Sequence, residues 1–67
     1  MNKLQEKVAD LRDEIERLID IKENQADEAY ANGNQLLTDE LDDDVLLLYD
    51  CVDKLDEVYD LLKNVLQ

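Results

Sequence analysis

The chain has 67 residues, of which 19 are Asp or Glu, seven are Lys or Arg and none is His, so its formal net charge is -12. This length accommodates at most one domain, and no run of about 18 apolar residues is present to span a membrane. One Cys, no His and no Gly-rich loop exclude disulfide frameworks, thiolate metal sites and phosphate-binding loops.

These exclusions set the first expectations about partners and location. We expect no cofactor and no metal. Nucleic acid and membrane are not expected as direct partners, because both present phosphate charges that would repel this chain. The N-terminal charges are followed by no apolar segment of the kind found in signal peptides, which favours a cytoplasmic location.

The first half of the chain predicts one amphipathic helix over about residues 3–31. Its apolar positions recur at alternating spacings of four and three residues, which is typical of a helical seam and not of a strand; they are Leu4, Val8, Leu11, Ile15 and Leu18. The register continues through Lys22, Gln25 and Ala29, so the seam weakens toward mid-chain. Acids recur every seven residues on the side predicted to face away from the seam: Glu6, Asp13, Asp20 and Asp27.

A turn is predicted at about residues 32–35, followed by a second helix over about 36–66. Gly33 is the only glycine, and its Asn neighbours also tolerate the left-handed backbone that ends helices. Asn34 or Thr38 is the candidate cap of the second helix. Its seam is longer than the first and has no polar interruption; it comprises Leu41, Val45, Leu48, Val52, Leu55, Tyr59, Leu62 and Leu66.

Together these elements predict an all-α fold in which residues 1–67 form a single antiparallel two-helix hairpin with coiled-coil-like packing. With Gly33 in the turn, residue i faces roughly residue 67 minus i. This register places Lys22 opposite Val45 and Asp44. We therefore predict an ion pair between Lys22 and Asp44.

More apolar residues are present than one two-helix seam can cover. The surplus side chains proposed to mediate self-association are Leu46, Leu47, Tyr49, Ile19 and Ile21. Clustered exposed apolar residues usually mark an interface, so we expect a homodimer that forms a four-helix bundle. The alternative interpretation is that these are ordinary, partly exposed residues.

The second half carries ten acids and two bases, and several acids are like-charged neighbours at i,i+4, which costs helix stability. The acidic residues proposed to bind a partner are Asp39, Asp43, Asp50, Asp53, Glu57 and Asp60. Such rows display charge somewhat as a DNA strand does. They favour a non-catalytic regulatory protein that binds and inhibits a protein with a basic, nucleic-acid-binding surface. The alternatives are a solvated outer face that serves only solubility and a structural or chaperone-type bundle subunit.

One segment of the second helix resembles an enzyme signature. Thr38-Asp39-Glu40-Leu41-Asp42 is similar to the Ser-Gln-Glu-Leu-Asp signature of the small aspartyl-phosphate phosphatases that act on sporulation response regulators, with Asp39 in place of Gln. The resemblance implies a helical hairpin in which Asp42, accompanied by Glu40, positions water for attack on the partner's phosphoaspartate. The other interpretation of Asp42 is a solvent-facing acid near the start of a helix.

Overall fold

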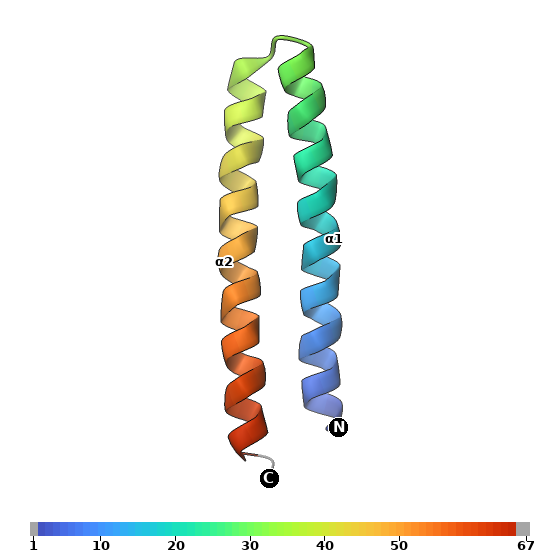
Figure 1. Cartoon of the computed structure of the whole chain (residues 1–67), viewed down its shortest axis with the longest axis vertical. Coiled ribbons are helices and arrows are strands. Elements are labelled where there is room, and N and C mark those ends of the chain that lie inside the picture. The colour runs from blue at the N-terminus through green and yellow to red at the C-terminus, as the bar shows by residue number, and fades with distance from the viewer. Residues whose placement is uncertain (1, 66–67) are drawn as a thin grey trace.

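The computed structural model describes residues 2–65 and contains two long helices, α1 (Lys3–Ala31) and α2 (Gln35–Val65). They run antiparallel along their full length, so that the start of α1 lies beside the end of α2, opposite the turn (Figure 1). The expected all-α hairpin is confirmed. The last predicted seam position, Leu66, lies outside the described residues.

Local hydrogen bonds explain where each helix begins and ends. Asn2 caps α1 by accepting a hydrogen bond from the Leu4 N–H (2.8 Å), and Asn34 caps α2 by accepting one from the Leu37 N–H (3.2 Å). At the end of α1 the Gly33 N–H donates to the Tyr30 carbonyl and the Asn34 N–H donates to the Ala29 carbonyl. This pair of bonds is the Schellman arrangement. It needs a left-handed residue at Gly33, whose φ is +75°.

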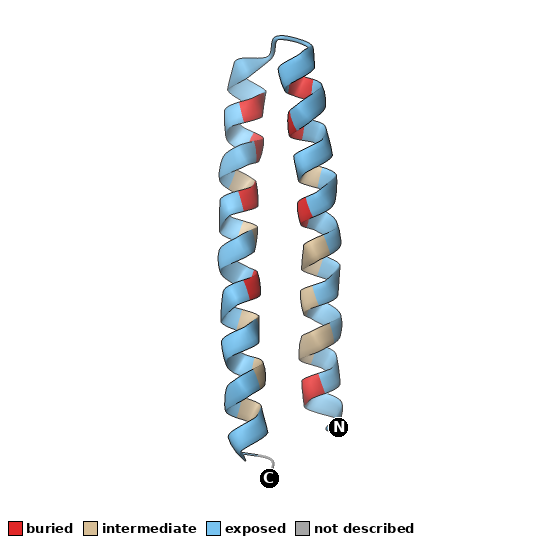
Figure 2. Cartoon of the chain, in the orientation of Figure 1, coloured by how far each residue is buried: buried red, intermediate tan, exposed pale blue. Residues whose placement is uncertain are grey.

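The core is a single narrow seam between the helices (Figure 2). Its centre is a cluster of Ile19, Val45 and Val52, against which Ile15 and Leu48 pack. A second cluster near the turn joins Ala26, Ala29 and Leu41. Among residues 2–65 no large side chain is completely removed from solvent, so the hairpin by itself buries little apolar surface.

The seam of α2 matches the predicted one over the described residues, but the seam of α1 does not. Leu4, Leu11 and Leu18 were expected inside and instead are 51%, 47% and 40% exposed. The positions that follow them in the chain turn inward in their place: Gln5, Arg12, Ile19 and Ala26. Val8, Ile15, Lys22 and Ala29 belong to both registers, so the prediction was wrong at every second seam position.

The observed register has a clear physical reason near the turn. The predicted register would have placed Gln25 inside, whereas the observed one places Ala26 there beside Ala29, and these small side chains let Leu41 become 7% exposed. Lower in the hairpin, Arg12 reaches across the seam to Asp56. The predicted pair is confirmed: Lys22 Nζ lies 3.3 Å from Asp44 Oδ2.

Candidate functional site

The hairpin has two broad sides, and residues seven apart along a helix fall on the same side. On one side Glu16 of α1 lies near Tyr49 of α2, and Ala9 lies near Asp56, because each pair lines a shared shallow depression. On the other side Gln25 of α1 and Leu37 of α2 line a common hollow. These neighbours fix which residues of the two helices share each side.

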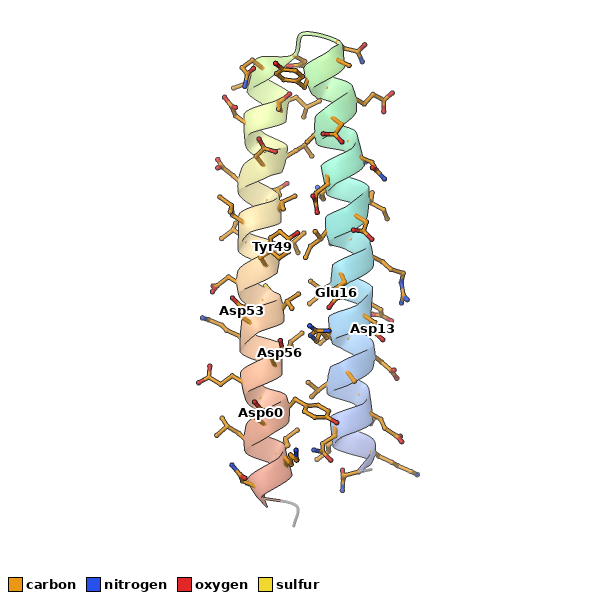
Figure 3. The ribbon with its side chains drawn as sticks, in the orientation of Figure 1. Asp13, Glu16, Tyr49, Asp53, Asp56 and Asp60 are labelled. Atoms are coloured by element: carbon orange, nitrogen blue, oxygen red, sulfur yellow. The ribbon has the colours of Figure 1, made fainter. Side chains whose placement is uncertain are left out.

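The first side is here called the acidic face. Within residues 2–65 it gathers eleven carboxylates and two bases; its acids are Glu6, Asp13, Glu16, Asp20, Glu23, Asp27, Asp39, Asp42, Asp53, Asp56 and Asp60. Figure 3 shows this face toward the viewer, with Asp13 and Glu16 on α1 beside Asp53, Asp56 and Asp60 on α2. The face therefore combines acids from both helices.

Arg12 lies in the middle of the acidic face and joins the two helices. Its guanidinium forms an ion pair with Glu16 one turn along α1, and its Nε lies 2.6 Å from Asp56 Oδ1 across the seam. The Nε atom is buried, and its N–H is not aligned for a hydrogen bond, so the contact with Asp56 is an ion pair rather than a hydrogen bond. All three side chains are more than one-third exposed, so solvent screens these pairs to about 1 kcal/mol or less each.

Tyr49 makes a second link across the acidic face. Its hydroxyl donates a hydrogen bond to Glu23 Oε1 at 3.2 Å. This bond, followed by the negative charge of Glu23, raises the Tyr49 pKa above its ordinary value of 10.0, and Asp20 and Glu16 add to the effect. The hydrogen bond to Glu23 and the neighbouring carboxylates thus disfavour the charged form of Tyr49.

The six acids proposed to bind a partner divide between two surfaces. Asp39, Asp53 and Asp60 lie on the acidic face. Asp43, Asp50 and Glu57 recur at the α2 position directly opposite the seam, so they form the outer edge of α2 and point away from α1. Sequence reasoning missed the participation of Asp56, Glu16 and Glu23. Asp56 lies on α2 itself, whereas the place of Glu16 and Glu23 beside α2 depends on the register of α1.

The residues proposed for self-association are also redistributed. Ile19 is 3% exposed and lies in the core, which corrects the expectation that it is available to a second chain. Tyr49 and Leu46 lie toward the acidic face, Tyr49 bound to Glu23. Ile21 and Leu47 are 52% and 66% exposed and lie on the opposite side of the hairpin. The residues predicted to mediate self-association therefore do not form one surface.

The residues singled out for chemistry do not converge. Glu40 and Asp42 are both exposed, and because they are two positions apart on a helix they point to different sides of α2. Within residues 2–65 no three acidic or Cys side chains come close enough to hold a metal ion. Cys51 is free and exposed.

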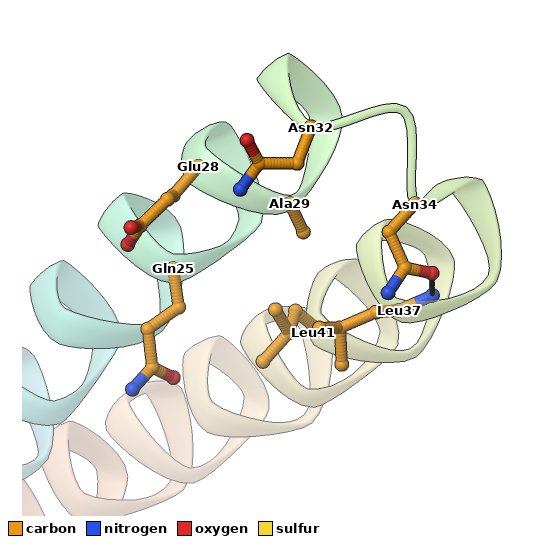
Figure 4. Close-up of a pocket in the computed structure, with 7 residues that line it drawn as sticks. All are labelled: Gln25, Glu28, Ala29, Asn32, Asn34, Leu37 and Leu41. Carbon is orange, nitrogen blue, oxygen red and sulfur yellow. Dashed lines mark hydrogen bonds between the residues drawn. The ribbon is translucent and has the colours of Figure 1, made fainter.

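A hollow lies beside the turn, on the side opposite the acidic face (Figure 4). Ala29, Leu37 and Leu41 form its apolar part, and polar side chains surround them: Gln25, Glu28, Asn32 and Asn34. It is open to solvent and carries no convergent set of titratable groups, so it does not have the form of a catalytic pocket.

Comparison with known proteins identifies no relative from which a function could be transferred. No family model matches the chain, and neither the curated proteins nor the solved structures include a match. Over the described residues, neither helix combines the length and apolarity needed to cross a membrane.

Proposed function

We propose that this protein is a small, non-catalytic interaction protein whose acidic face binds a basic surface of another protein and blocks it. The observation that carries the proposal is the uneven distribution of charge between the two sides of the hairpin. The acidic face holds eleven acids and two bases, whereas the opposite side, with Lys22 counted there, holds four acids and three bases. A surface that served solubility alone would have no reason to collect its carboxylates on one side.

The spacing of the carboxylates supports a partner that normally binds phosphate. Asp53, Asp56 and Asp60 follow one another at three and four residues on α2, which places neighbours about 5–6 Å apart. This is comparable to the separation of phosphates along a DNA strand. A protein whose Lys and Arg side chains hold nucleic acid would be attracted to such a row, and the association would be fast and sensitive to salt. In this proposal the protein acts as a homodimer with an acidic face on each outer side.

The test compares two triple variants with the same change of charge. Asp13→Asn, Asp53→Asn and Asp60→Asn remove three charges from the acidic face without breaking its ion pairs to Arg12. Asp10→Asn, Glu28→Gln and Glu40→Gln remove three from outside the acidic face. Tagged protein is used to capture basic proteins from cells of its source, and duplex DNA is then added as competitor.

The first variant should lose the captured protein and the second should retain it. Duplex DNA should release the captured protein, and salt of about 0.5 M should do the same because it screens charges beyond a few ångström. Capture that is independent of salt, or that is lost equally in both variants, contradicts the proposal. Circular dichroism of both variants shows whether either has lost its helices.

A further inference from the structure

The side opposite the acidic face is lined by exposed apolar residues and is here called the apolar face. It comprises Leu4, Leu11, Leu18 and Ile21 of α1 with Leu37, Leu47, Cys51, Val58, Leu61 and Val65 of α2. Within residues 2–65 the acids on this side are Asp44, Glu14, Glu28 and Glu40, and Lys7, Lys22 and Lys54 nearly balance them. It is therefore apolar, almost neutral and turned away from most of the chain's negative charge.

We propose that the apolar face is covered by a second copy of this chain, stacked face to face with both turns at the same end of a four-helix bundle. This deepens the proposed function, whose homodimer it specifies. The seam between the two helices leaves this face open, and half-buried Val8, Ile15 and Leu48 continue into it. The second copy would complete a core that one hairpin leaves thin.

The charge distribution argues for a second copy. Two chains that each carry a charge of -12 repel unless their acids are kept apart. Stacking through the apolar faces meets this condition, because each acidic face then lies on the outside of the bundle. An unrelated basic partner would find little negative charge on the apolar face to bind.

The size of the face is also adequate. The hairpin measures 52 × 14 × 9 Å between Cα atoms, and the two broad sides lie across its shortest dimension. A rectangle of its two longer dimensions covers roughly 700 Å², close to the ~800 Å² that each partner contributes to a standard interface.

The orientation follows from the order of polar and apolar residues along the face. The ion pairs Arg12–Asp56 and Lys22–Asp44 show which residues of α1 and α2 lie at the same level. Four successive pairs on the apolar face agree in polarity; from the chain ends toward the turn they are Leu4 and Val65, Leu11 and Val58, Leu18 and Cys51, and Gln25 and Asp44. The fifth pair, Asn32 and Leu37 beside the turn, does not agree.

Only the arrangement with the turns together keeps these four levels matched. In that dimer α1 of one copy lies over α2 of the other, so Leu11 meets the partner's Val58 and Gln25 meets the partner's Asp44. At the edges, Ile21 meets the partner's Leu47 and Glu14 meets the partner's Lys54. With the turns at opposite ends, Leu11 would instead meet the partner's Gln25 and Val58 would meet the partner's Asp44, which buries polar groups against apolar ones.

The level beside the turn is the exception to this match. Leu37 is 41% exposed and lies at the level of the hollow. When α2 of one copy lies over α1 of the other, the partner's Leu37 comes onto the α1 wall of the hollow near Gln25 and Asn32. This level places an apolar side chain against polar ones, so the orientation rests on the four levels between it and the chain ends.

Two adjacent leucines test the interface. Leu46 and Leu47 are 68% and 66% exposed, but Leu46 lies toward the acidic face and Leu47 at the edge of the apolar face. Sedimentation should show a dimer of the 7.8 kDa chain. Leu47→Glu should raise the dissociation constant of the dimer at least about tenfold, whereas Leu46→Glu should leave it unchanged.

A wild-type chain that stays monomeric at all concentrations overturns the proposal, and so does equal weakening by both variants. Sedimentation of the wild-type chain and of the two variants involves no basic partner. A failure of the proposed dimer is therefore distinguishable from a failure of the proposed function. Circular dichroism recorded with each variant separates dissociation from loss of the helices.

A distance measurement tests the orientation. A spin label is attached to Leu36→Cys in a Cys51→Ser background, since Leu36 is 73% exposed and lies opposite the seam. Leu36 is about 14 residues from the middle of α2, or roughly 21 Å at ~1.5 Å per residue. Turns at the same end should give a label separation below about 30 Å, the width of a bundle, and turns at opposite ends one above about 40 Å.

A separation in the longer range overturns the proposed orientation. The native Cys51 provides a second readout. With the turns together it faces the partner's Leu18, so mild oxidation of the wild-type dimer should not link the chains. Rapid formation of a disulfide between the two copies of Cys51 requires them to be stacked on one another, which only the opposite orientation allows.

Discussion

Replacing Ile19 tests the register on which both faces depend. Ile19 is 3% exposed and contacts Val45 and Val52, so Ile19→Ala removes three carbons from the tightest part of the core. At ~0.8 kcal/mol per carbon the transfer loss is about 2.5 kcal/mol. The narrow seam can partly close over the gap, so we expect the lower part of the ~2–5 kcal/mol range for such changes.

This loss is large for so short a chain. A core of this size stabilises the folded state by only about 3–5 kcal/mol. Ile19→Ala should therefore remove most of the free energy of unfolding. The assay is urea denaturation followed by far-UV circular dichroism, at one protein concentration for all variants. Leu36→Ala is the control, because Leu36 is 73% exposed and should cost less than about 0.5 kcal/mol. Equal destabilisation by the two changes would refute the observed register of α1.

Three further predictions concern the turn, the N-terminal end of the seam and the acidic face. Gly33→Ala should destabilise the hairpin by about 1–2 kcal/mol and Gly33→Asn by less, because φ is +75° and a Cβ there meets no atom within 4 Å, so only backbone strain acts; equal losses in denaturation would contradict this. Gln5→Leu should raise the urea midpoint, since Gln5 is 8% exposed in the apolar seam, and a lowered midpoint would show that its amide is needed. Because the folded-state Tyr49 pKa lies above 10.0, the stability from its hydrogen bond is complete below pH ~10 and is lost as pH rises through that raised pKa. Ultraviolet titration against a Tyr49→Phe reference should show Glu23→Gln lowering this pKa, and an unchanged value would refute the assigned cause.

Most of the fold could be predicted from the sequence because its signals are local. The four–three spacing of apolar residues, the Asn caps and the single left-handed Gly33 each act within a few residues, and together they determine two helices and a turn. Antiparallel pairing with Gly33 in the turn then sets the level of each residue against the other helix. The predicted pair of Lys22 and Asp44 followed from that constraint.

The rotation of α1 about its own axis was decided only by tertiary packing. Leu18 and Ile19 are both apolar and adjacent, so periodicity alone accommodated either one in the seam. The choice depended on contacts across the hairpin: Ala26 and Ala29 packing against Leu41, and Arg12 reaching Asp56. Relative to the predicted register, α1 is rotated about its axis by about one helical position. This rotation turns Leu4, Leu11 and Leu18 outward and brings the acids of α1 beside those of α2. Long-range packing therefore determined which side of this protein is acidic and which is apolar, and composition alone contains neither fact.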